Sequence, residues 1–381
     1  MSTEPRAGVD WRDTAARAGS LAVCGVLPLL LLVGVLRIAQ QDGYPAWDFH
    51  HELYPQAKLM LSGENPYPTA DVDPRVGTNL VWPPVAAFLV SPFTLLAPVT
   101  ADWVFALLGL LGFAGALWLV GVRDWRVYGV AALWPPVYIE LGLSHLTPAL
   151  ALLLAAAWRT RDARYTSGLL VGFAIAIKFF AWPLALWLAA CGKWRAVALA
   201  AVLPLASVLL VLPFTGLDEY LGGLLRVGRA FDDDSYTVFG LVVQAGGPEP
   251  VARASNIAVV VALALATVRY RSFTLAVATA LAASPIVWLD YFALAAVPLA
   301  AARPRLSPVW FVPLVTLGLE GAGLEIGDTL GTVRVLGAFS IVLAVAFRAE
   351  LEATEMRTAT PRASRPVSSP GPGAARHRVL D

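Results

Sequence analysis

The sequence AGSLAVCGVLPLLLLVGVLRI, residues 18–38, decides the class of fold. It is about as long as the ~20 apolar residues that one α-helix needs to cross a bilayer. Arg6, Arg12 and Arg17 precede it, as in a signal peptide, but no small-residue cleavage site follows. We therefore expect a first transmembrane helix that enters from the cytoplasm, because flanking arginines stay inside.

The composition of the whole chain agrees with a membrane location. Of its 381 residues, 58% are hydrophobic and only 14% are charged, and the mean hydropathy is +0.67. One soluble core needs far less apolar sequence, so we expect an all-α integral membrane protein. The net charge of +1 gives no basis for nucleic-acid binding. Cys24 and Cys191 lie in apolar segments, which indicates packing roles and neither a disulfide framework nor a zinc site. No cofactor or metal is expected.

Apolar runs separated by short basic clusters predict about twelve membrane spans with both chain ends in the cytoplasm. After the first, the expected spans cover residues 82–97, 102–122, 127–157, 196–214, 251–268, 274–287, 291–302, 309–319 and 330–347. Residues 167–191, between basic clusters at 159–164 and 193–195, are expected to form a short hairpin with Lys178 near its outer tip. One full span is the alternative, but it would leave Lys178 near mid-bilayer at a cost of about 3 kcal/mol.

These spans divide the chain into three parts. Residues 1–17 are a cytoplasmic N-terminus, residues 18–348 a membrane domain, and residues 349–381 a disordered cytoplasmic tail rich in Pro, Ser, Arg and Ala. The membrane domain has outer loops at about 40–81 and 215–250. The first loop contains a helix-compatible stretch before a turn, so surface helices are expected there.

The stretch WDFHHELY, residues 47–54, lies in the first outer loop and concentrates ionisable side chains in a chain that avoids them near its spans. If a helix starts here, Asp48, His51 and Glu52 share one face at three- and four-residue spacing, so they point into one cavity. This pattern favours the reactive mouth of a membrane enzyme. An interfacial loop with solvated charges is the alternative.

The apolar region at 127–157 is interrupted by a Pro-Pro pair and by Glu140, Ser144 and His145. Non-helical backbone at membrane depth is tolerated only where protein or a water-filled cavity satisfies it, so this break is expected to line the cavity. Alternatively, Glu140 and His145 only pair with each other or with backbone.

Two further acidic positions have a structural and a functional interpretation. Asp290 lies at an expected outer turn, where it is either part of the site or a plain helix cap. The aspartate run at 232–234 is interpreted as a solvated turn, although clustered carboxylates also suit hard cations.

Several short motifs occur in a particular order along the chain. They are Asp48 after the first span, Gly63 with Asn65-Pro66-Tyr67, Trp82-Pro83-Pro84 at the entry to the second span, Gly142-x-x-His145, Gly168-Leu-Leu-Val-Gly172 leading to Lys178, and Ser284-Pro285-x-x-Trp288. Together, over about residues 18–347, they resemble glycosyltransferase family 87, the polyprenol-phosphate-mannose-dependent mannosyltransferases of the GT-C class. The chain departs from the family pattern at Leu143, where Gln is usual, and at Leu289-Asp290-Tyr291, where histidines are usual.

The resemblance implies a GT-C-type bundle whose catalytic residue is the aspartate of the first outer loop, which matches Asp48. It also implies inverting transfer of a mannosyl residue from a polyprenyl-phosphate donor to an envelope glycolipid or glycan, on the outer face of the cell membrane. On chemical grounds, a donor that leaves as a phosphate needs chiefly one base for the acceptor hydroxyl and cations for the phosphate. The candidates for phosphate contact are Lys178, Arg226 and Arg229, and those for other substrate contacts are His51, Glu52, Tyr54, Tyr67, Glu140, His145, Trp288 and Asp290.

Other functions fit parts of the same pattern. An arabinofuranosyl or other sugar transferase, or a glycan ligase of the same class, would share the outer site. A secondary transporter predicts inverted repeats and charged residues at mid-bilayer, and neither is evident in the sequence. The expected partners are the sugar donor, the acceptor and membrane lipids.

Overall fold

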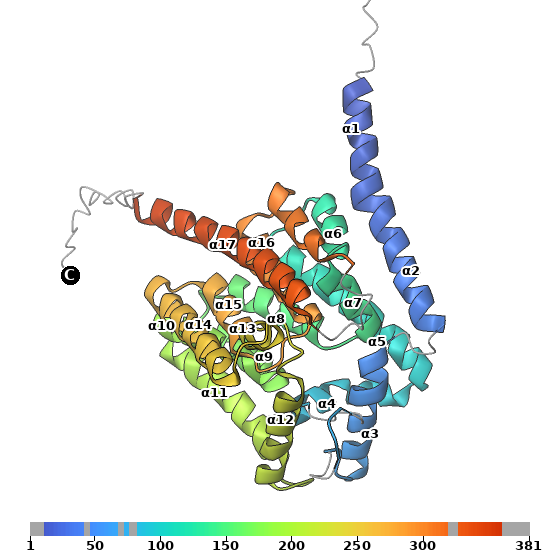
Figure 1. Ribbon diagram of the computed structural model, residues 1–381, viewed down its shortest axis with the longest axis vertical. Helices are drawn as coiled ribbons and strands as arrows, with labels where there is room; N and C mark the ends of the chain where they lie inside the picture. The colour runs from blue at the N-terminus through green and yellow to red at the C-terminus, as the bar shows by residue number, and fades with distance from the viewer. Residues whose placement is uncertain (1–10, 42–45, 68–71, 76–81, 319–326, 360–381) are drawn as a thin grey trace, which may run out of the picture.

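The computed structural model describes residues 11–41, 46–67, 72–75, 82–318 and 327–359, and every regular element in these residues is a helix (Figure 1). This confirms the all-helical class that the composition predicts. Four helices are long and apolar enough to cross a bilayer, at Thr14–Ile38, Pro98–Leu119, Glu249–Tyr270 and Thr329–Met356. The protein is therefore a membrane protein.

The helices follow one another along the chain with short connections. Up to Ile177 they are α1 (Trp11–Leu21), the π-helical η1 (Ala22–Val26), α2 (Leu27–Gln41), the π-helical η2 (Phe49–Leu53), α3 (Tyr54–Ser62), α4 (Pro84–Val90), the 3-10 helix η3 (Ser91–Leu95), α5 (Pro98–Leu119), α6 (Trp125–Ala132), α7 (Pro135–Leu143), α8 (Thr147–Arg159) and α9 (Thr166–Ile177). They continue with the 3-10 helix η4 (Phe179–Ala181), α10 (Pro183–Ala190), α11 (Trp194–Leu209), α12 (Leu217–Phe231), α13 (Val238–Gln244), α14 (Glu249–Tyr270), α15 (Phe273–Ala283), the 3-10 helix η5 (Leu289–Ala295), α16 (Ala296–Ala302), the 3-10 helix η6 (Pro308–Thr316) and α17 (Thr329–Ala359).

The expected number of twelve complete spans is not confirmed. The other apolar helices have only 10–17 residues, and proline explains part of this shortening. The span expected at 82–97 is α4 followed by a 3-10 turn with proline in its first turn. The α-helix expected at 309–319 is the 3-10 helix η6, which contains Pro313. Proline lacks the N–H that an α-helix interior needs, and its ring clashes with the preceding turn.

Two helices extend beyond the limits expected from composition. Helix α1 begins at Trp11, within the segment assigned to the cytoplasmic N-terminus. Helix α17 continues to Ala359, so the prediction of a disordered tail is wrong for residues 349–359. The Glu350 carboxylate accepts hydrogen bonds from Ser272 Oγ (2.6 Å) and Phe273 N (2.9 Å), which anchors this part of α17 to the start of α15. Residues 360–381 lie outside the described residues.

Close packing of two glycines determines the path of the chain through α9, α10 and α11. A Cβ on Gly168 would lie 2.3 Å from Ala196 O, and one on Gly172 would lie 3.1 Å from Ala200 Cα. These contacts advance in the same direction along α9 and α11, so the two helices are parallel and α10 must run back between them. Lys178, with an extended backbone (φ −145°, ψ 114°), ends α9 at the turn. This geometry agrees with the hairpin expected for residues 167–191.

Several of the basic clusters therefore gather at one end of the bundle. The starts of α9 and α11 lie there, and so does the end of α14, because Cys191 Sγ contacts Arg271 O at 3.9 Å. Three aromatic rings also pack against one another at this end, with ring centres 5.1–6.3 Å apart. They are Trp158 near the end of α8, Trp187 near the end of α10 and Phe273 at the start of α15. Helices α3, α4 and α12 gather at the opposite, lower end of the view in Figure 1.

Candidate active site

A cavity of about 510 Å³ lies among residues of the loop after α2, helix α12 and the Lys178 turn. Segments far apart in the sequence contribute to its lining, including η2, α12 and the chain between α15 and η5. The lining includes Asp48, Glu52, Trp82, His145, Lys178, Trp288 and Tyr291. The fold thus brings two carboxylates from the loop after α2, one histidine and one lysine to a single space.

Asp48 is fixed by the short π-helical turn that follows it. The next residue, Phe49, is fully buried and stacks on Phe105 of α5 with ring centres 4.2 Å apart. Asp48 itself is 3% exposed, and its Oδ2 forms an ion pair with His145 Nε2. The stacking holds the start of η2 against α5, which positions Asp48 at the cavity wall.

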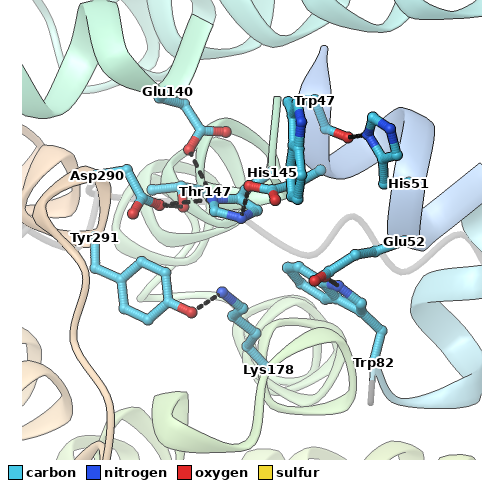
Figure 2. A network of polar contacts seen from close by, with 11 residues as sticks. Trp47, His51, Glu52, Trp82, Glu140, His145, Thr147, Lys178, Asp290 and Tyr291 are labelled. Atoms are coloured by element: carbon cyan, nitrogen blue, oxygen red, sulfur yellow. Dashed lines mark hydrogen bonds and ion pairs between the residues drawn. The ribbon is translucent and has the colours of Figure 1, made fainter. Parts of the chain in front are cut away.

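Only two of the three residues expected on one helical face reach the cavity. Asp48 and Glu52 line it, and Glu52 accepts a hydrogen bond from Trp82 Nε1 at 2.9 Å. His51 instead bonds through Nδ1 to Trp47 O at 2.8 Å, with the two rings 4.5 Å apart (Figure 2). A π-helical turn holds more residues than an α-helical turn, so the three- and four-residue spacing no longer aligns all three side chains.

His145 is placed by a sharp end to α7. Ser144 adopts a left-handed conformation (φ 54°, ψ 58°) that a non-glycine residue rarely takes, and its N–H bonds to Glu140 O at 2.6 Å. The chain then turns into α8, and the imidazole contacts Asp48 on one side and Asp290, seen in Figure 2, on the other. The helix break expected at Glu140–His145 therefore does place a side chain at the cavity. A strained residue at such a position is typical of functional sites.

The imidazole of His145 contacts a carboxylate at each nitrogen. Besides the Asp48 contact at Nε2, its Nδ1 lies 3.2 Å from Asp290 Oδ2 and 3.7 Å from Glu140 Oε2. Thr147 Oγ1 donates to the same Asp290 oxygen at 2.9 Å. All three acidic residues are at most 4% exposed, and His145 is 8% exposed. Asp290 is therefore part of this network, and its side chain does more than cap a helix.

Glu140 has an unusual position within the network. Neither of its carboxylate oxygens has a hydrogen-bond partner among the described residues, and a water-sized cavity of about 20 Å³ lies beside it. Ligand atoms of Glu140, His145 and Asp290 lie within 4.8 Å of one another, a spacing that can also suit a divalent cation. His145 Nδ1 and Asp290 Oδ2, 3.2 Å apart, are also within hydrogen-bond range, so a proton can lie between them without an ion.

Lys178 lines the same cavity. Its Nζ donates a hydrogen bond to the Tyr291 hydroxyl and lies 4.4 Å from the centre of the Trp82 ring. In the described part of the chain it forms no ion pair with a carboxylate. Aromatic neighbours stabilise a cation without neutralising it, so the ammonium charge remains available to an anionic ligand.

Arg75 also lines the cavity, and the sequence analysis did not single it out. Its guanidinium bonds to Asp234 at 2.9 Å and to Asp233 at 3.1 Å, and it lies 5.3 Å from the centre of the Phe231 ring. Two residues of the aspartate run thus form exposed ion pairs with Arg75, which is compatible with a solvated turn and adds a partner that the sequence did not indicate. The sequence did contain one signal that could have drawn attention to Arg75, since it is the only basic residue between Lys58 and Arg123.

The structure places several other candidates outside the cavity lining. Arg226 and Arg229 are on α12, whose lining residues are apolar or glycine. Tyr54 is buried and donates its hydroxyl to Leu96 O at 3.1 Å. Tyr67 packs edge-on against Tyr220, with ring centres 4.8 Å apart. Burial raises the pKa of both Tyr67 and Tyr220, so these two phenols stay neutral.

A comparison with protein-family models finds one match, described as Glycosyltransferase family 87, over residues 80–298. The matched segment is more than half of the chain. It includes His145, Lys178 and Asp290, while Asp48 precedes it. No curated protein and no solved structure matches the chain.

Proposed function

Because the chain belongs to glycosyltransferase family 87, we propose that it transfers a mannosyl residue from a polyprenyl-phosphate donor to an envelope glycolipid or glycan. The family establishes the general activity, that of a membrane-bound glycosyltransferase. The identity of the sugar, the inverting course and the acceptor class are our proposal. Because the family consists of glycosyltransferases, membership in it argues against the alternative of a secondary transporter.

The observation that carries the mechanism is the presence of Asp48 and Lys178 in the lining of one cavity. In the proposed reaction the acceptor hydroxyl gives its proton to the Asp48 carboxylate while its oxygen attacks the anomeric carbon. The bond between that carbon and the phosphate oxygen breaks on the opposite face. Polyprenyl phosphate leaves with the bonding electrons, and a cation stabilises the charge that develops on it.

Lys178 is the first candidate for contact with the donor phosphate. Its ammonium group lines the cavity, and its partners in the described structure are a hydroxyl and aromatic rings rather than a carboxylate. Arg75 is the second candidate, since it lines the same cavity at its outer side. Arg226 and Arg229 rank behind both, because they lie outside the lining.

The lining also offers groups suited to a sugar. Glu52 and the indole rings of Trp82 and Trp288 combine a carboxylate with flat apolar surfaces. A pyranose presents hydroxyls at its rim and C–H groups on its faces, so we assign these three residues to the transferred sugar or the acceptor. Tyr54 and Tyr67, which pack elsewhere, then support the outer loop.

The position of the basic clusters supports an extracytoplasmic site. Arg164 precedes the start of α9, and Arg195 lies in the first turn of α11. The Lys178 turn follows the opposite end of α9, and α11 runs parallel to α9. Basic residues near span ends favour the cytoplasm, which directs the cavity outward. We therefore propose a multi-pass protein of the cell membrane whose active site faces outside.

The proposal is tested by incubating the purified protein with polyprenyl-phosphate-mannose and a panel of envelope glycolipids, followed by mass measurement of the products. Asp48→Asn serves as the paired control. A hexose added by the wild type and not by the variant supports the proposal. Transfer of a pentose from polyprenyl-phosphate-arabinose, with no hexose transfer, would assign the protein to the arabinofuranosyl alternative.

A further inference from the structure

Asp48 is not an isolated carboxylate. Its Oδ2 is buried against His145 Nε2, while the residue as a whole still lines the cavity. One oxygen is thus committed to the imidazole, which leaves Oδ1 as the oxygen that can meet an acceptor hydroxyl. The position of His145 therefore determines which atom of Asp48 acts.

The contacts of His145 indicate its protonation state. A neutral imidazole has one N–H and one bare nitrogen, so one of its nitrogens would turn a lone pair toward a carboxylate. Nδ1 is hydrogen-bonded to Asp290, and Asp48 Oδ2 lies against Nε2 as an ion-pair partner without a hydrogen bond, so only the imidazolium form turns no lone pair toward a carboxylate. Thr147 Oγ1 adds a second donor to the Asp290 oxygen and fixes that carboxylate in turn.

The charges around the imidazole balance if Glu140 is a neutral acid. The carboxylates of Asp48 and Asp290 then contact the His145 imidazolium, and the Lys178 ammonium adds positive charge in the vicinity of Asp290. Glu140, whose oxygens have no partner in the described residues, is the group least able to hold a buried negative charge. Tyr291, bonded to Lys178, is the remaining titratable group of the adjoining η5 helix.

We propose that His145, held as an imidazolium by Asp290 and Thr147, is a positioning residue that fixes Asp48 with Oδ1 toward the acceptor. This inference rests on the proposed function of Asp48 as general base. Without the contact, the Asp48 side chain could rotate, and a displacement of about 1 Å can cost roughly 100-fold in rate. His145 acts through Asp48 and needs no contact with substrate.

The proposal predicts opposite changes in the pH dependence of two variants. His145→Gln keeps an amide donor for Asp48 but removes the cation, so Asp48 becomes protonated more readily and the acidic limb of the kcat/KM profile moves up by about one pH unit or more. Asp290→Asn removes an anion that favours the imidazolium, so the alkaline limb moves down. In both variants kcat falls about 10- to 100-fold, while KM for the donor changes little.

His50→Gln is the matched control. His50 also pairs with a buried carboxylate, Asp102 at 2.8 Å, yet it does not line the cavity. This variant should keep both limbs of the profile whatever it does to thermal stability. If His145→Gln does not fold, the test rests on Asp290→Asn alone. A downward shift of its alkaline limb supports the positioning role, and an unchanged alkaline limb contradicts it.

The positioning role is overturned if the limbs of the pH profile stay in place in both His145→Gln and Asp290→Asn. If Asp48→Asn is inactive in the same experiment, the proposed function remains intact. An active Asp48→Asn would overturn the general base itself. The profiles are also measured after treatment with EDTA. An unchanged wild-type profile supports a proton at the network, and a profile that collapses and returns with Mn²⁺ overturns the imidazolium in favour of a bound cation.

Discussion

Lys178 Nζ lies 3.7 Å from the centre of the Tyr291 ring, at the point where α9 ends and the chain turns back toward the basic end. An ammonium group in a membrane protein is costly unless it is solvated or paired. Here a hydroxyl, two aromatic faces and a large cavity surround it. This arrangement keeps the positive charge in place and open to an anion.

The first prediction concerns the donor phosphate. Lys178→Ala should raise KM for the polyprenyl-phosphate donor by about 10- to 100-fold, since a hydrogen bond to a charged group contributes roughly 1.5–3 kcal/mol. Lys178→Arg should lose less, because it keeps the charge although not the geometry. Steady-state kinetics with varied donor provides the measurement. Equal donor KM values in all three proteins would assign Lys178 a structural role only.

The second prediction concerns Asp48. Asp48→Asn keeps the shape of the side chain and removes the proton acceptor, so turnover should fall by roughly two to four orders of magnitude while donor binding persists. Asp48→Glu should recover little, because the longer side chain displaces the carboxylate by about 1 Å. Turnover and donor binding are measured on the same folded preparations. Full activity of the asparagine variant would move the base assignment to Glu52.

The third prediction concerns topology. Single cysteines at Arg161 and Arg195, in a background with Cys24 and Cys191 replaced by alanine, should resist an impermeant thiol reagent in intact cells. A cysteine at Asp218, near the start of α12, should react and serves as the outer control. The reason is that the parallel course of α9 and α11 places both basic sites at one end. Labelling of either site from outside contradicts the hairpin.

The fourth prediction tests the packing that creates the hairpin. Gly168→Ala should lower the free energy of unfolding by about 1–3 kcal/mol, because the new methyl group overlaps the Ala196 carbonyl oxygen. Gly34→Ala in α2 is the control, since no atom lies within 4 Å of its added Cβ. Thermal unfolding in detergent compares the two proteins. Equal melting temperatures would show that α9 and α11 separate freely at this point.

The sequence predicted the membrane class and named most of the ionisable residues that meet in the cavity. Asp48, His145 and Asp290 were each identified from local features, namely a charged loop, a helix break and an outer turn. Their contact could not be predicted, because it joins three segments separated by about a hundred residues or more. A local pattern carries no information about such pairing.

Two misses have the same physical origin. The pairs of Arg75 with Asp233 and Asp234 link two loops far apart in the sequence, so neither loop alone indicates them. The π-helical turn at Phe49–Leu53 depends on packing of Phe49 against Phe105 in another helix, which local spacing does not reveal. Tertiary contacts decided both features.

The length of α9 determines how deep in the membrane the proposed active site lies. Its 12 residues rise about 18 Å, whereas the hydrocarbon layer is about 30 Å thick. If α9 starts at the cytoplasmic edge, Lys178 lies roughly 12 Å beneath the outer headgroups. The hairpin alone therefore does not remove the cost of a charge at that depth, and the hydroxyl, aromatic rings and cavity around Lys178 must offset it. The tail of a lipid donor lies in the bilayer, but its phosphate belongs at headgroup level, so both the donor phosphate and the acceptor hydroxyl must be lowered into the cavity. Acceptors with a slender, projecting terminal sugar would therefore be used, and those whose hydroxyl is recessed among bulky branches would be rejected.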